Sequence, residues 1–207
     1  MTLEAWALFC LTETVLCLSP GPSALLVMSL GLTRGQAASV RATLGVLAAN
    51  AFYFALSGSG LVAVHAQSRE VFFAVKWAGA AYLIWLGLRT IARTFRTRPA
   101  SARLPAATEG RRAFWQGLVT QGANPNLLVY FTAILPQFVD PAHRLPGQVA
   151  TLAFSSFAVE FAVLSAYGAL AFRAGRRAAP RFRLAFERVG GGLLIAAGAG
   201  LASLRRQ

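Results

Sequence analysis

Several charged side chains stand inside apolar stretches of this 207-residue chain, and three of them are of types that could do chemistry there. Glu160, in FAVEFAVL, has apolar neighbours on both sides for more than a turn. An acid in that setting could bind an ammonium group or exchange a proton during transport; a structural ion pair is the alternative. Glu13 lies on the same face of the helix as Pro20, so it could belong to a binding site or make a packing contact between helices. Lys76 is near enough to a helix end to extend toward the headgroups. We assign Glu160, Glu13 and Lys76 as candidate coupling or charge residues.

Prolines interrupt two of the apolar stretches. LCLSPGPSALL contains Pro20 and Pro22, and GANPNLL contains Pro125. Proline has no N–H and crowds the carbonyl one turn earlier, so each break leaves backbone groups without a helical partner. In lipid that costs several kcal/mol per group unless the broken backbone lines a cavity or finds protein partners. An ordinary kink would explain one such break, whereas two matched breaks favour a binding site.

The broken segments also have the composition of helix starts. Ser19-Pro20 and Asn124-Pro125 each place a capping residue before a proline at the first helical position. The N-terminal ends of two such half-helices would attract a carboxylate, and the freed carbonyls would accept from an ammonium, so a small zwitterion fits both. The predicted substrate-binding residues are Ser19, Pro20, Gly21, Pro22, Ser23, Gln121, Asn124, Pro125, Asn126 and Glu160.

The elements that must position these residues are membrane helices. The chain is 56% hydrophobic with a mean hydropathy of +0.55, too apolar for a soluble domain of this size. Six apolar stretches, 5–32, 42–66, 71–88, 113–139, 149–172 and 184–204, are each near or above the ~18 residues that a span needs. We predict an all-α polytopic protein of six transmembrane helices, the first and fourth broken near the bilayer midplane. The first lacks the basic start of a cleaved signal and is expected to be retained.

Basic residues are distributed unequally between the two faces. Of the 20 Lys and Arg residues, 15 lie between predicted helices one and two, three and four, or five and six, with Arg188 at the start of the sixth helix counted among them. The positive-inside rule therefore places these loops in the cytoplasm and both termini outside. The net charge of +13 is explained by topology, and nucleic-acid binding is not expected because no soluble domain exists to carry it.

The order of helices predicts an internal repeat. FCLTETVLCLSP and FWQGLVTQGANP both place a proline eleven residues after a phenylalanine. We expect one three-helix repeat over residues 1–92, a cytoplasmic linker over 93–112 and a second repeat over 113–207. An odd number of helices inverts the second repeat relative to the first, and paired Pro/Gly breaks in inverted repeats point to a transporter binding site.

Other chemistry has little support in the sequence. No HExxH, GxSxG or P-loop pattern is present, so we expect no enzyme, catalytic residue, cofactor or metal. A membrane thiol-redox relay and an exporter of another small solute or of a metal ion remain alternatives. The relay is disfavoured because both cysteines lie in the first predicted helix, seven residues apart.

Several motifs together resemble the lysine and homoserine/threonine exporter superfamily (LysE/RhtB). They are SPGP in the first helix, KWAGAAYLIWLGLR in the third, GANPNLLVYFTAILPQFV in the fourth and an acid in the fifth. MTLEAW and KWAGAAYLIWLG look most like the homoserine and threonine exporters. The resemblance implies export of a small amino acid across a bacterial inner membrane, driven by protons, with a homodimer as a further expectation.

The family motifs match this chain at seven positions: Pro20, Gly21, Pro22, Lys76, Asn124, Pro125 and Glu160. Two positions differ. Ser23 stands where the family often has Asn, and Asn126 stands where it usually has Lys. The second difference removes a positive charge beside the predicted site.

Overall fold

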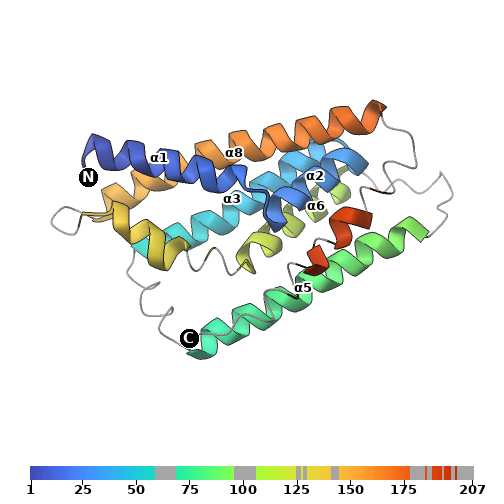
Figure 1. Cartoon of the computed structure of the whole chain (residues 1–207), viewed down its shortest axis with the longest axis horizontal. Coiled ribbons are helices and arrows are strands. Elements are labelled where there is room, and N and C mark those ends of the chain that lie inside the picture. The colour runs from blue at the N-terminus through green and yellow to red at the C-terminus, as the bar shows by residue number, and fades with distance from the viewer. Residues whose placement is uncertain are drawn as a thin grey trace.

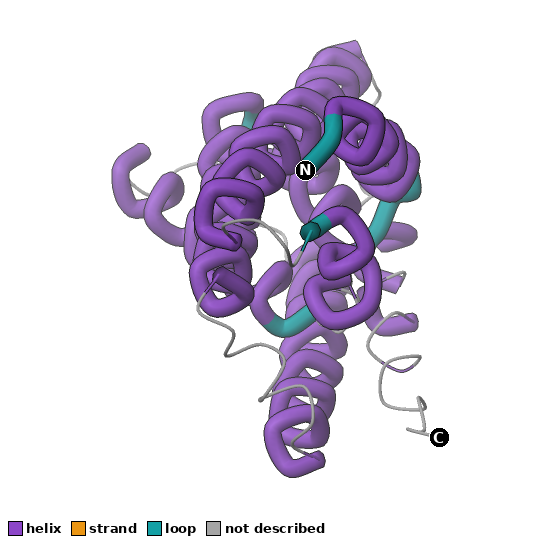
Figure 2. The backbone as a smooth tube through the Cα atoms, turned by 90° about the vertical axis from the view of Figure 1, so that its left-hand side faces the viewer, coloured by secondary structure: helices purple, strands orange, loops and turns teal. Residues whose placement is uncertain are grey.

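The fold is a bundle of helices, seen in a computed structural model. The structure describes residues 1–58, 69–95, 106–124, 127, 130–140, 145–177, 185, 188–192, 194–196 and 199. Within them it contains helices and loops and no strand (Figures 1 and 2). The elements are α1 (Leu3–Leu18), α2 (Pro22–Arg34), α3 (Gln36–Gly58), α5 (Arg69–Phe95), α6 (Ala106–Gly122), the π-helix η1 (Tyr130–Ile134), the 3-10 helix η2 (Leu135–Phe138) and α8 (Leu145–Arg177).

The lengths of these helices suit a membrane. Helices α3 and α8 are each long and apolar enough to cross a bilayer, and α1 with α2 passes the same test as one bent pair. The described residues therefore give two spans, or three with the bent pair. An all-helical membrane fold is confirmed, whereas the six-helix count, the inverted repeat and the division at 93–112 stay predictions.

The first apolar stretch is broken, but its second helix begins two residues later than the sequence suggests. Ser19 ends α1 as its C-cap, and α2 starts with Pro22 at its first position and Gly21 as N-cap. The two helices meet at 57°. The expected start at Ser19-Pro20 is thus wrong. A residue before proline favours extended backbone, and both Ser19 and Gly21 are extended. A helix that began at Pro20 would have to continue through Gly21, which its extended backbone prevents.

The second expected break lies where α6 ends. This helix stops at Gly122, and the Asn124 N–H donates to the carbonyl of Gln121 at 2.9 Å. Further along the chain, residues 130–138 form the π-helix η1 and the 3-10 helix η2. Pro125 and Asn126 lie outside the described residues, so the predicted helix start at Asn124-Pro125 stays a prediction.

One end of the bundle is closed by small residues, which we call the small-residue core. An added Cβ at Gly31 of α2 would lie 2.5 Å from the carbonyl oxygen of Gly168 in α8. A Cβ at Gly45 or Gly117 would collide with the backbone across the α3–α6 contact. Glycine at these positions lets helix backbones touch, as membrane helices do when no water drives them together. This core also buries a continuous apolar cluster that includes residues of α2, α3, α5, α6 and α8.

The opposite end contains an aromatic cluster, made of Phe9, Tyr53, Phe54, Tyr130, Phe131, Phe138 and Phe157. Its rings come from α1, α3, η1, η2 and α8. Phe54 meets Phe131 edge to face with ring centroids 4.8 Å apart, and Phe9 meets Phe138 likewise at 5.3 Å. This end lies near the N-terminus, on the left in Figure 1. The bundle thus has a backbone-packed end and a ring-packed end.

Candidate functional site

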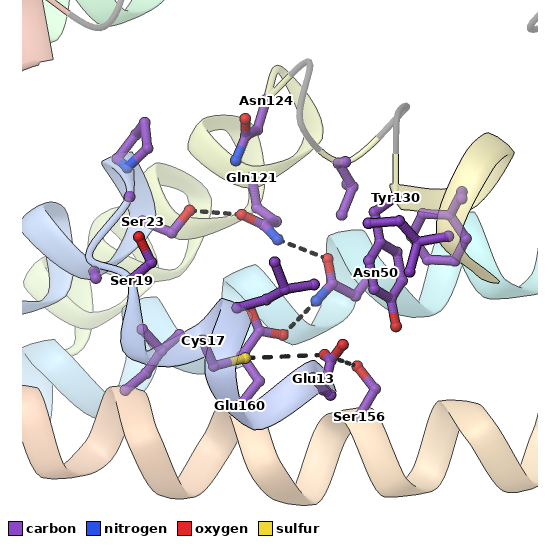
Figure 3. A pocket seen from close by; sticks show the side chains of 18 of the residues that line it. Glu13, Cys17, Ser19, Ser23, Asn50, Gln121, Asn124, Tyr130, Ser156 and Glu160 are labelled. Atoms are coloured by element: carbon purple, nitrogen blue, oxygen red, sulfur yellow. Dashed lines mark hydrogen bonds between the residues drawn. The ribbon is translucent and has the colours of Figure 1, made fainter. Parts of the chain in front are cut away.

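A cavity of about 390 Å³ lies between these two ends, at the break between α1 and α2 (Figure 3). That size is within the range of small-molecule sites. Its walls come from α1, α2, α3, α6, η1 and α8 together. The lining residues are Glu13, Leu16, Cys17, Ser19, Gly21, Pro22, Ser23, Ala24, Asn50, Phe54, Gln121, Asn124, Leu127, Tyr130, Phe131, Ile134, Ser156, Glu160 and Leu164.

A row of hydrogen bonds crosses the cavity and joins four helices (Figure 3). The hydroxyl of Ser23 in α2 donates to Gln121 Oε1 in α6 at 2.7 Å. Gln121 Nε2 in turn donates to Asn50 Oδ1 in α3 at 2.9 Å. Asn50 Nδ2 donates to the carboxylate of Glu160 in α8. All four side chains are buried, so the row ties α2, α6, α3 and α8 together around the cavity.

The second acid of the cavity is held by α8 and by its own helix. Glu13 of α1 accepts a hydrogen bond from the Ser156 hydroxyl at 2.6 Å. The Cys17 thiol, one turn further along α1, donates to the same oxygen at 3.9 Å. Glu13 is 6% exposed and Glu160 is 8% exposed. The described lining residues of this cavity thus include two acids and no basic side chain.

The N-terminal end of α2 forms another part of the wall. Gly21, Pro22, Ser23 and Ala24 all line the cavity. Its N-cap residue, Gly21, has no side chain and so makes no capping hydrogen bond. The N–H groups of the first turn have no partner within the helix by its geometry, and they carry the positive end of its dipole. This wall can therefore attract an anionic group.

The structure brings most of the predicted site residues together. Eight of them line the cavity: Glu13, Ser19, Gly21, Pro22, Ser23, Gln121, Asn124 and Glu160. Pro20 does not line it, because the link between α1 and α2 leaves this ring exposed. Lys76 lies in α5, and its side chain is outside the described set. Pro125 and Asn126 lie outside the described residues as well.

Three polar lining residues were not predicted. Asn50 is an isolated amide in the apolar stretch 42–66, which was itself a signal for a buried hydrogen-bonding role. Ser156 lies one helical turn before Glu160 on the same face of α8. Tyr130 follows the predicted second break. It lines the cavity as part of the π-helix η1, which the sequence did not predict.

The remaining chemistry of the described residues is limited. They contain no group of three His, Cys, Asp or Glu side chains that could hold a metal ion. Cys10 and Cys17 are both free and both on α1. Cys17 lines the cavity and Cys10 does not.

Apolar helices of bilayer-spanning length around a buried polar cavity define an α-helical membrane protein of the transport class. Residues 14–205 match the family described as LysE type translocator, and the chain belongs to that family. It is therefore a transporter and not an enzyme.

Its relatives include proteins with assigned cargo. The chain is 33% identical over 210 residues to a homoserine/homoserine lactone efflux protein of Salmonella typhimurium, with 99% of each chain covered. It is 28% identical over 123 residues to a leucine efflux protein of Enterobacter sp., covering 59% of this chain and 58% of that one. An uncharacterized membrane protein of Vibrio cholerae is 33% identical over 85% of both chains. No solved structure gives a significant match.

Proposed function

We propose that this protein exports a small neutral amino acid, homoserine-like or threonine-like, from the bacterial cytoplasm in exchange for protons. The observation that carries the proposal is the cavity at the α1–α2 break. It combines the N-terminal end of a helix with two buried acids, and its described lining has no basic side chain. The names of the efflux relatives agree with this class of cargo.

The two kinds of wall suit the two charges of a zwitterion. The first turn of α2 would bind the carboxylate through its N–H groups. Glu13 and Glu160 would supply the negative charge that balances the ammonium. Apolar lining residues such as Leu16, Leu127 and Phe131 leave room for a short side chain without a charge.

Proton exchange follows from charge balance in the same cavity. Two buried carboxylates are costly when both are ionised, and the described lining residues offer no basic side chain to balance them. Either a bound ammonium or a proton relieves that cost. A proton and a substrate would therefore replace one another at the site, which is what an antiporter requires.

Glu160→Gln tests this assignment. The variant keeps the shape of the side chain and removes its titratable group, so homoserine efflux driven by protons should fall to background while membrane abundance stays near normal. Efflux and abundance would be measured together in bacteria that lack their own exporters, with threonine and leucine as further cargo. Glu4→Gln, an exposed acid at the start of α1, is the matched control and should transport normally. Normal transport by Glu160→Gln, or a loss equal to the loss of protein, would contradict the site.

The orientation in the inner membrane is part of the proposal. Two contacts bring arginine-bearing ends of helices together at one end of the bundle. Gly35, which follows α2, is near Phe172 of α8, and Gly110 of α6 is near Arg41 of α3. This supports one basic face in the cytoplasm, with both termini outside. A reporter fused within 93–112 should be cytoplasmic, and one fused after residue 207 should be external. A cytoplasmic C-terminus would overturn the orientation or the count of six helices.

A further inference from the structure

The four-residue row across the cavity has a single direction. Ser23 donates to Gln121, Gln121 to Asn50, and Asn50 to Glu160. Each hydrogen therefore points toward the carboxylate. The row starts on α2, where the proposed function places the substrate carboxylate, and ends on α8 (Figure 3).

The acid at the end of the row dictates this direction. An ionised carboxylate only accepts hydrogen bonds, so Asn50 must turn its NH2 group toward Glu160. The amide oxygen of Asn50 then faces Gln121, and the oxygen of Gln121 faces Ser23. A protonated Glu160 can instead donate to an amide oxygen. Because an amide turned through 180° keeps its shape, both amides can reverse without repacking the helices around them.

We propose that Asn50 and Gln121 are positioning residues that pass the protonation state of Glu160 to Ser23. With Glu160 ionised, Ser23 gives its only hydrogen to Gln121, so its oxygen presents lone pairs to the cavity. With Glu160 protonated, Gln121 donates to Ser23 and the hydroxyl hydrogen of Ser23 turns toward the cavity. Ser23 thus changes from an acceptor to a donor although it is not ionisable itself.

This change bears on the amino group of a substrate, and the inference rests on the proposed function. In an α-amino acid the ammonium is bonded one carbon away from the carboxylate. A carboxylate on the first turn of α2 therefore holds the ammonium beside the Ser23 side chain. An accepting Ser23 binds that ammonium, and a donating Ser23 opposes it. One proton on Glu160 then weakens substrate binding at both ends of the row, and by linkage the substrate weakens proton binding equally.

The surroundings of Glu160 contain few competing groups. Among the described lining residues, the other ionisable side chains are Glu13 and Cys17 from α1 and Tyr130 from η1. Glu13 has its own donors in Ser156 and Cys17 and takes no part in the row. The described lining residues from α2, α3 and α6 are not ionisable.

An infrared experiment tests the row without any ligand. Full-length protein in lipid nanodiscs, with glutamine carbon-13-labelled at the side-chain carbonyl, would be compared at high and low pH. We expect a carboxyl band that is absent from Glu160→Gln, and with it a shifted glutamine band that is absent from Gln121→Met. Gln36→Met, an exposed glutamine at the start of α3, is the control and should keep the band. A spectrum without the Glu160 band, or with that band and no glutamine shift, overturns the relay.

Binding of L-homoserine measured against pH gives the second readout. The wild-type affinity should weaken as the pH falls. Gln121→Met should remove the part of this pH-dependent change in affinity that depends on Ser23. That part should be about tenfold in affinity, because it corresponds to one hydrogen bond to a charged group. Ser23→Ala should remove the same part, and the double variant no more than either. Ser155→Ala, outside the cavity, should keep the wild-type profile.

Each outcome of the binding experiment has a distinct meaning. If Gln121→Met changed the affinity for homoserine by the same factor at all pH values, the role of Gln121 would be merely structural and the relay would be overturned. Additive effects of the two substitutions would overturn it too, because two residues on one path cannot act independently. Absence of homoserine binding by the wild type at every pH would contradict the proposed cargo, while the infrared result would still decide the relay.

Discussion

The two ends of the cavity are closed in different ways, one by contacts between helix backbones and the other by aromatic side chains. At the small-residue core, helix backbones touch at Gly31, Gly45 and Gly117, and no side chain stands between them. At the aromatic cluster, rings from five elements fill the space, and two of those elements are the irregular helices η1 and η2. Backbone contacts leave no freedom to adjust, whereas rings can turn about their side-chain bonds. We therefore expect the aromatic end, rather than the small-residue core, to change shape during transport.

Local backbone geometry supports the same contrast. The small-residue core lies between regular α-helices. The aromatic end includes a π-helix over Tyr130–Ile134 followed directly by a 3-10 helix. Both types have poorer hydrogen-bond geometry than an α-helix, and π-turns recur at functional sites. Opening at this end would therefore break weaker backbone hydrogen bonds than opening at the small-residue core.

The largest expected effect is at the small-residue core. Gly117→Leu places a side chain against the backbone of Ala42, where even a Cβ has no room, so α3 and α6 must separate. We expect a loss of at least about 3 kcal/mol and little folded protein in the membrane. Abundance and thermal stability in detergent measure it. Gly147→Ala, where an added Cβ meets nothing within 4 Å, should be neutral. A stable, active Gly117→Leu protein would remove the rigid half of the comparison.

A smaller effect on stability and a separate effect on transport are expected in the aromatic cluster. Phe131→Leu conserves most of the apolar volume, so destabilisation should stay within about 1–3 kcal/mol. Because Phe131 lines the cavity and contacts Phe54, Tyr53 and Tyr130, the transport rate should change while abundance stays near normal. Phe154→Leu, on the exposed face of α8, is the control. Equal transport by Phe131→Leu and the wild type would argue against movement at this end.

The smallest effect is expected where α1 is attached to α8 at the same end. The indole N–H of Trp6 donates to the Ser155 hydroxyl at 3.0 Å. Trp6→Phe removes this bond, and interhelical hydrogen bonds in membranes are worth only about 0.6 kcal/mol on average. Thermal stability should therefore fall slightly, and Ser155→Ala should produce the same change. A Trp6→Phe loss as large as that of Gly117→Leu would show that the aromatic end is as rigid as the other.

The sequence predicted those parts of the site that depend on single unusual residues. An acid such as Glu160 is costly inside a span, and a proline such as Pro22 interrupts a helix wherever it stands. Asn50 was overlooked because an isolated amide gains a role only from its partners, and those lie on α6 and α8. The helix start was misplaced by two residues because both prolines suit a first position and the local dihedral angles decide between them. The direction of the hydrogen bonds in the row could not be predicted either, because it depends on contacts between residues of four different helices.

The break between α1 and α2 also bears on how the chain enters the membrane. With 16 residues, α1 is about 24 Å long, less than the ~30 Å thickness of the hydrocarbon layer. Synthesis delivers α1 first, so the insertion machinery meets a segment that cannot cross the bilayer alone. Only when α2 follows does the pair reach the length of a span. We therefore expect α1 to enter the membrane only together with α2, so the break that shapes the cavity would also affect how the chain inserts.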